Sequence, residues 1–303
     1  GSTPTASPRP CDVASPICNV RAVPNERFDR YKRLIIEHRE HGVMLITLSN
    51  PGKLNATDAL MHAELATIFA DIHASPEVRA VVVTGEGTAF SAGGDLDWIS
   101  LQVGDHARTM AAMREGGDIV RTMIECDTPI ISAINGVAVG AGLAVALLAD
   151  ISIIDEDTKF TDGHIRIGVV AGDHAVSIWP LLCGMAKAKY YLMTSDFITG
   201  REAERIGLVS KALPGDQVLP DALAIAERLA RGPREAIMLT KRALNHWLRQ
   251  ALPNFEASLA YDLAAVPRHP LARPHLQRHD ACGCQGFLQS RSEPFSDHFQ
   301  VIP

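Results

Sequence analysis

The stretch from Thr128 to Asp150 constrains the fold of this chain more than any other segment. It begins with an apolar, β-branched run at 130–134, turns through glycine and alanine, and continues as an apolar segment of helical length. The turn Gly140-Ala141-Gly142 opens the expected helix, where backbone N–H groups have no internal partner and the helix dipole adds partial positive charge. Because small residues let a ligand approach the backbone, this turn can hold a developing oxyanion; the alternative is a tight packing turn.

A second segment has the same design. Val81 to Thr84 is a continuous apolar, β-branched run, which is typical of a buried strand. It leads through Gly85 to Ala89 into the small-residue stretch from Phe90 to Leu96 and then into a segment with helical character. The chain therefore contains two strand–turn–helix units with backbone donors at the turn.

Strands and helices alternate along the first two thirds of the chain, and the last third is mostly helical, which favours an α/β fold. The expected strands are a pair around Gly42 within 34–48 and single strands at 78–84, 130–134 and 151–154. The expected helices are one capped by Thr57 or Asp58 and others at 106–126, 141–149, 186–193, 201–206, 217–230 and 233–262.

Five motifs in a fixed order resemble the crotonase superfamily, also called the enoyl-CoA hydratase/isomerase family. They are Lys53 to Ala56, Ala89 to Asp95, Pro129 to Asp150, Gly168 to Pro180 and Ile206 to Ser210. The resemblance covers roughly residues 28 to 265. It implies a spiral core of repeated ββα units over 28–200 and a C-terminal helical trimerisation region with a tail over 201–303. Residues 1–27, rich in Pro, Ser and Thr, are expected to form a disordered tail.

The resemblance also implies the ligand and the assembly. The expected partner is an acyl-CoA substrate, so coenzyme A arrives as part of the substrate and no separate cofactor is expected. The expected assembly is a homotrimer or a hexamer. The formal net charge of −6 and the lack of basic blocks give no indication of nucleic-acid binding, and no apolar run reaches the ~18 residues of a membrane span. The Cys282–Cys284 pair lacks a matching second pair, so no metal site is predicted and a cytoplasmic protein with reduced thiols is expected.

By the same resemblance, two backbone N–H groups bind the thioester carbonyl, and they fall on Ala92 and Ala141. Such donors stabilise the negative charge that builds on the oxygen when an enolate or a tetrahedral adduct forms. The alternative for both residues is a packing role alone. The residues expected to line the coenzyme A groove are Lys53, Leu54, Ala56, Gly93, Gly94, Asp95 and Leu96. For Lys53 the alternative is a solvated turn lysine.

The catalytic side chains depart from the hydratase pattern, in which two glutamates shuttle the protons of water. The matching positions are Ala144 and His164, so both glutamates are absent. Histidine can transfer protons near neutral pH, whereas alanine cannot. Asp173 follows nine residues after His164, and the stretch from Asp162 to Pro180 resembles a relative that hydrolyses a carbon–carbon bond in a diketone. His164 and Asp173 are therefore the predicted proton-transfer pair.

Other interpretations of this stretch stay open. His164 and Asp173 could instead cap a strand and a helix, Asp162 is an alternative acid, and His174 is expected to be exposed at a helix start. Three functions compete: a lyase, isomerase or hydratase acting on acyl-CoA; a hydrolase of an acyl-CoA thioester or β-dicarbonyl; and a catalytically inactive paralogue that binds acyl-CoA. The missing glutamates favour the last two, and the two turns with a His/Asp pair favour the first two.

Overall fold

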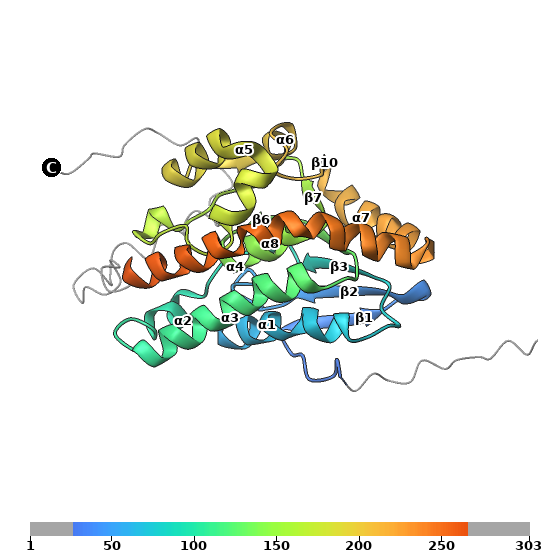
Figure 1. Cartoon of the computed structure of the whole chain (residues 1–303), viewed down its shortest axis with the longest axis horizontal. Coiled ribbons are helices and arrows are strands. Elements are labelled where there is room, and N and C mark those ends of the chain that lie inside the picture. The colour runs from blue at the N-terminus through green and yellow to red at the C-terminus, as the bar shows by residue number, and fades with distance from the viewer. Residues whose placement is uncertain (1–26, 266–303) are drawn as a thin grey trace, which may run out of the picture.

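The computed structural model describes residues 27–265. The predicted tail over 1–27 therefore lies almost wholly outside the described residues, as does the part of the C-terminal region after residue 265 and the Cys282–Cys284 pair. Residues 27–265 form a mixed α/β structure in which helices pack on both faces of one large sheet (Figure 1). The expected α/β class is confirmed.

The large sheet has six strands in the order β1-β2-β3-β5-β7-β10. The first two form an antiparallel hairpin, and the others join in parallel. The strands are β1 (Leu34–His38), β2 (Val43–Leu48), β3 (Ala80–Gly85), β5 (Ile130–Ile134), β7 (Ile151–Asp155) and β10 (Lys211–Leu213). The predicted strands are confirmed to within two residues at each end, because parallel strands buried on both faces read as unbroken apolar runs.

Short strands complete a repeated strand–strand–helix pattern. β4 (Ala89–Ser91) pairs in parallel with β6 (Val137–Ala138), and β8 (Lys159–Phe160) pairs with β9 (Ile198–Thr199). Each of β3, β5 and β7 is followed by one of these short strands and then by a helix. This order agrees with the expected spiral of ββα units. Strands of two or three residues carry no readable periodicity, so the sequence did not indicate them.

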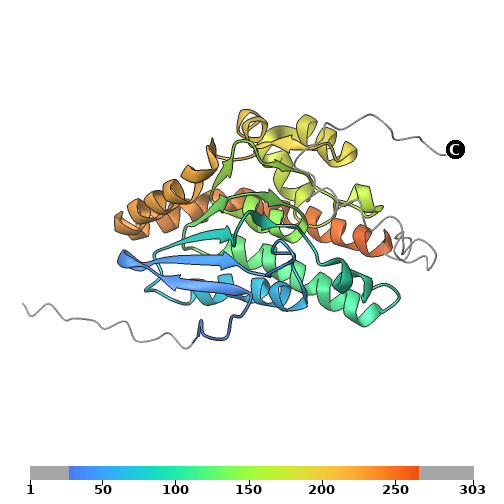
Figure 2. The ribbon, with the colours of Figure 1, turned by 180° about the vertical axis from the view of Figure 1, so that it is seen from behind.

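Two hydrophobic clusters lie on opposite faces of the sheet. Along β3, Val81 and Val83 belong to the cluster under α1 (Ala59–His73) and α3 (His106–Glu125), whereas Ala80 and Val82 pack against α7 (Gly215–Arg231). Successive side chains of a strand point to opposite faces, which explains the alternation. Figure 1 shows α1, α3 and α8 (Arg234–Ala265) in front of the sheet, and Figure 2 shows β1 and β2 from behind.

The helices that follow the core depart from their predicted bounds. α5 spans Ala175–Thr194 and not only 186–193, and it contains Pro180 and a break at Gly184, where φ is 78° and ψ is 155°. These two residues interrupt the helical spacing of the apolar side chains, so this spacing indicated only the last part of α5. α6 (Gly200–Arg205) agrees with its prediction. The division of the chain after residue 200 stays a prediction. Within residues 27–265, none of the helices combines the length and apolar character needed to cross a membrane.

α8 is fixed to the sheet by a buried lysine. Lys241 Nζ lies 2.7 Å from the Asp150 carboxylate and donates to the Thr128 carbonyl at 2.8 Å, and its side chain is 6% exposed. Replacing Lys241 by methionine should lower the free energy of unfolding by about 3 kcal/mol, because Asp150 loses its counter-charge. Urea denaturation of the variant measures the loss. Lys211→Met is the control, because it breaks the exposed pair with Asp221 and should cost less than about 1 kcal/mol. Equal losses in the two variants would contradict this account.

Candidate active site

A cavity of about 210 Å³ lies where α1, α2 (Leu96–Ser100), α3 and the start of α4 (Gly140–Leu148) meet. Most of its lining is apolar, and a small number of polar side chains interrupt it, which is the usual composition of a small-molecule site. Its polar and glycine lining includes His62, Gly94, Thr109, Gly116, Gly140, His164, Asp173 and His174.

The start of α4 forms one wall of this cavity. Val139 precedes the helix and gives no side-chain cap, and Gly140, Ala141 and Ala144 line the cavity. The first N–H groups of a helix have no partner within it, so this wall presents backbone donors to a ligand. Gly142 is required here, because a Cβ at this position would lie 2.3 Å from the Cβ of Ser91 at the end of β4. The structure thus places Ala141 on the cavity wall, where Ala144 adds only a methyl group. The role of the Ala141 N–H as an oxyanion donor stays a prediction.

Ala92 is placed differently. Its N–H donates to the carbonyl of Leu54 at 3.0 Å, and the cavity wall nearby is made by Gly94. Leu54 and Asn55 both have positive φ angles, 49° and 56°, so the loop turns its backbone toward Ala92. The sequence indicated two available donors, but a backbone partner from a distant loop cannot be recognised in a local motif. A donor role for Ala92 stays a prediction, and it requires the Leu54 carbonyl to move away from the Ala92 N–H.

The residues predicted to line the coenzyme A groove lie together, and two of them bind each other. Lys53 Nζ lies 2.6 Å from the carboxylate of Asp95 and 2.9 Å from that of Asp97. Asp95 also caps α2 by accepting from the backbone N–H groups of Asp97 and Trp98. Burial raises the pKa of the Asp95 carboxyl, but the Lys53 hydrogen bond and the other contacts outweigh it, so this pKa lies below its ordinary value. The remaining members are Leu54, Ala56, Gly93, Gly94 and Leu96, and a coenzyme A role stays a prediction for all of them.

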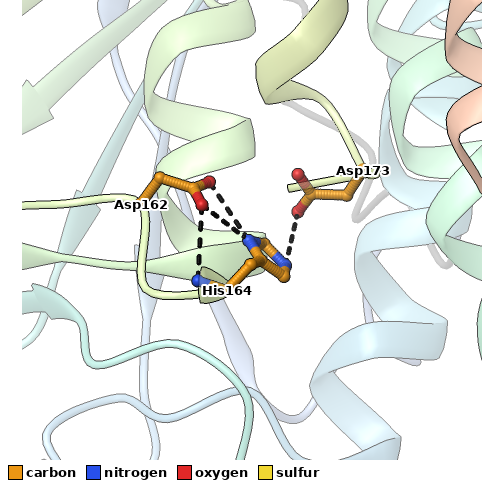
Figure 3. A group of neighbouring side chains, drawn as sticks. All are labelled: Asp162, His164 and Asp173. Atoms are coloured by element: carbon orange, nitrogen blue, oxygen red, sulfur yellow. Dashed lines mark hydrogen bonds and ion pairs between the residues drawn. The ribbon is translucent and has the colours of Figure 1, made fainter. Parts of the chain in front are cut away.

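His164 is held by Asp162 (Figure 3). The Nδ1 atom of His164 lies 3.0 and 3.1 Å from the two carboxylate oxygens of Asp162, and the backbone N–H of His164 donates to the same carboxylate at 3.3 Å. The Asp162 side chain is fully buried, whereas that of His164 is 16% exposed and lines the cavity. Asp162, which the sequence suggested only as an alternative acid, is therefore the direct hydrogen-bond partner of the imidazole.

Asp173 lies on the other side of the same imidazole. One of its carboxylate oxygens is 3.6 Å from Nε2 of His164, and the other accepts from the N–H of Ala175 at 3.4 Å. Burial raises the pKa of Asp173, but the neighbouring His174 and His164 outweigh it and hold this pKa well below its ordinary value. The predicted neighbours His164 and Asp173 are thus brought together, and the helix contact expected of Asp173 is present as well.

His174 is buried, so the prediction that it is exposed is wrong. None of its surface is accessible, and its Nδ1 lies 2.8 Å from Asp173 without the alignment of a hydrogen bond. The first turn of α5 packs inward, and Ala175 and Trp179 are also fully buried. The sequence indicated a helix start at His174 but not which side of that helix faces the core, because this depends on how α5 packs.

A second imidazole lies on the cavity wall, and the sequence alone did not indicate it. His62 of α1 lines the cavity, and its Nδ1 lies 2.7 Å from the carboxylate of Glu115 on α3. In the sequence these residues are 53 positions apart, so only the packing of α1 on α3 brings them together. The one available signal was a histidine directly after the apolar Met61 of the predicted first helix.

The enoyl-CoA hydratase/isomerase family model matches residues 38–297. The chain belongs to the enoyl-CoA hydratase/isomerase family. Among its relatives is a Mycobacterium tuberculosis protein named "Probable enoyl-CoA hydratase EchA12", which is 33% identical over 217 residues, 70% of this chain and 76% of that protein.

Two solved structures of the family's fold are informative. An enoyl-CoA hydratase/isomerase from Mycobacterium paratuberculosis has a TM-score of 0.77 and 31% identity, with 82% of this chain and 98% of that chain covered. A β-diketone hydrolase from the cyanobacterium Anabaena, bound to (S)-3-oxocyclohexyl acetic acid, has a TM-score of 0.74 and 26% identity, with 80% of this chain and 97% of that chain covered. The same fold therefore occurs in an enoyl-CoA hydratase/isomerase and in a β-diketone hydrolase.

Asp162, His164 and Asp173 could also offer three ligand atoms to a metal ion, because these atoms lie within 4.8 Å of one another. In this protein, however, Nδ1 of His164 lies at direct hydrogen-bond distance from the carboxylate of Asp162. An ion would have to replace that contact. The arrangement fits a hydrogen-bonded proton-transfer group better, and the expectation of no metal site stays a prediction.

Proposed function

We propose that this protein acts on an acyl-CoA thioester, with the carbonyl oxygen bound at the start of α4 and with His164 as the general base. The observation that carries the proposal is that His164, held by Asp162, lines the same cavity as Ala141 at the uncapped start of α4. Membership of the enoyl-CoA hydratase/isomerase family supports acyl-CoA as the substrate class.

The Asp162 contact determines what the imidazole can do. When Nδ1–H donates to the carboxylate of Asp162, neutral His164 has its lone pair on Nε2. Nε2 can then take a proton from water or from the carbon next to the carbonyl. The carboxylates of Asp162 and Asp173, on opposite sides of the ring, stabilise the imidazolium that forms. The electrons left on the substrate move to the carbonyl oxygen, where backbone donors of α4 stabilise the resulting negative charge.

A second candidate is hydrolysis of a thioester or a β-diketone. The similar fold of the Anabaena β-diketone hydrolase favours it. In this reaction His164 removes a proton from water, and the hydroxide adds to a carbonyl to give an oxyanion at the start of α4. The oxyanion then collapses. The bond to sulfur or to carbon breaks, and the imidazolium returns its proton to the leaving thiolate or enolate.

One assay separates these possibilities. The purified protein is mixed with crotonyl-CoA while enoyl absorbance and free thiol are followed together, and with a cyclic β-diketone in parallel. Loss of absorbance without thiol identifies a hydratase, thiol release identifies a thioester hydrolase, and loss of the diketone alone identifies the second candidate. Calorimetric binding of acyl-CoA without turnover of any substrate would favour the inactive paralogue. An absence of both binding and turnover would refute the acyl-CoA proposal.

We also propose that the chain assembles as a trimer or as a dimer of trimers. Helices α5 and α8 expose large apolar side chains, among them Met193, Leu244 and Trp247, which are 63–71% exposed in the single chain. Exposed apolar surface of this kind is typical of an interaction site. Light scattering at micromolar concentration is expected to give three or six times the chain mass. The monomer mass at that concentration would contradict the expectation.

A further inference from the structure

His62 and Glu115 form a second histidine–carboxylate pair at the same cavity. The ion-pair distance is 2.7 Å, and the side chain of His62 is only 9% exposed, whereas that of Glu115 is 34% exposed. His62 lines the cavity beside Trp98, whose ring centroid is 4.9 Å from that of His62. The pair belongs to α1 and α3, so it stands on a different wall from His164 and Asp173, which belong to the segment before α5.

The Glu115 contact leaves one ring atom of His62 for a ligand. Nδ1 of His62 is hydrogen-bonded to the carboxylate of Glu115, and among residues 27–265 no group is hydrogen-bonded to Nε2. Nε2 faces Gly116, where a Cβ would lie 3.9 Å from it, so this wall is kept open by the missing side chain. The hydroxyl of Thr109, another polar residue of the α3 wall, has the carbonyls of Gln102 and Asp105 within hydrogen-bond distance and can donate to either. The side chain of His62 is 9% exposed and lines the cavity, so a ligand that fills the cavity would cover Nε2 and separate it from water. A polar atom covered in this way needs a hydrogen-bond partner, which is the reason to expect that the ligand supplies one.

We propose that Nε2 of His62 binds a hydroxyl or keto oxygen on the acyl group and so makes the enzyme selective for oxygenated acyl chains. This inference rests on the proposed function, because it assumes that an acyl group occupies the cavity. A hydroxyl can donate to neutral His62 or accept from its charged form, and a keto oxygen accepts from the charged form. A carboxylate is disfavoured, since Glu115 already supplies the negative charge at this position and a second one would be repelled. His62 is therefore a specificity-determining residue of the acyl site.

The test measures binding of stable 2-oxoalkyl thioether analogues of hexanoyl-CoA by calorimetry. The analogues are the plain chain, chains hydroxylated at carbon 4, 5 or 6, and a chain ending in a carboxylate. At least one hydroxylated analogue should bind the wild-type protein about tenfold more tightly than the plain one, as expected for one hydrogen bond to a buried partner. In His62→Leu, the ratio of the dissociation constants of the plain and hydroxylated analogues should fall to about one. Because the ratio compares two ligands on one protein, partial unfolding of a variant does not alter it.

Two further variants make the result decisive. Gly116→Ala places a methyl group beside Nε2 in a helix that favours alanine, so it should reduce the preference without loss of stability. His73→Leu is the matched control, because His73 belongs to the same helix and pairs with Asp127 but does not line the cavity. It should keep the preference. Equal binding of plain and hydroxylated chains, a preference that survives in His62→Leu, or tighter binding of the carboxylate would overturn the inference alone. If no analogue binds, the proposed function fails together with it.

Discussion

Turnover is expected to fall by about 10²–10⁴ when His164 is replaced by alanine, because the variant has no group to take the proton at the cavity wall. Steady-state kinetics on the substrate found in the combined assay measures the loss. Acyl-CoA should still bind, since the donors at the start of α4 belong to the backbone. His106→Ala is the control, because His106 is exposed at the start of α3 and should leave turnover unchanged. Full activity of the His164 variant would place the chemistry elsewhere.

The two carboxylates around His164 are expected to differ in effect. Asp162→Asn replaces the carboxylate 3.0 Å from Nδ1 with a neutral amide that no longer fixes the tautomer of the ring, so it should cost nearly as much as the loss of the imidazole. Asp173→Asn should also lower turnover, but less, because Asp173 stands 3.6 Å from Nε2. Comparison of the two variants on one substrate checks the order. A larger loss for Asp173 would show that it transfers a proton itself.

Removal of the backbone donor at position 141 is expected to lower turnover by about 10²–10³. Ala141→Pro replaces the amide hydrogen with a ring carbon, and proline is tolerated in the first turn of a helix, where that N–H has no internal partner. Ala141→Gly keeps the N–H and should retain most of the activity. Circular dichroism and calorimetry confirm that both variants are folded and bind ligand. Equal turnover in the two variants would mean that this donor does not stabilise the transition state.

The sequence predicted those parts of the molecule that depend on local patterns. The buried runs at β3 and β5, the cap of α1 at Asp58 and the small-residue turn at Ala141 follow from propensity, burial and capping, and the structure has them where they were expected. The α/β class and the family follow from these same motifs in order.

The contacts that define the site chemistry depend on segments that are distant in sequence or irregular in backbone. The Leu54 carbonyl reaches Ala92 through two positive φ angles, and Glu115 reaches His62 only because α1 packs on α3. Asp162 is near His164 in sequence, but which of the two flanking carboxylates binds Nδ1 depends on how the chain turns after β8. Burial of His174 could not be predicted because the side of α5 that faces the core depends on its tertiary packing and not on the position of the helix start.

If Asp162 and His164 act as one proton-transfer unit, their substitutions should not be additive, and the double variant His164→Ala/Asp162→Asn measures this. Its turnover is measured beside that of the two single variants on the same substrate, with acyl-CoA binding checked in each. The double variant should lose little more than the worse single variant, because a carboxylate that works through the imidazole has no effect once the ring is absent. Losses that multiply in the double variant would show that the two residues act independently.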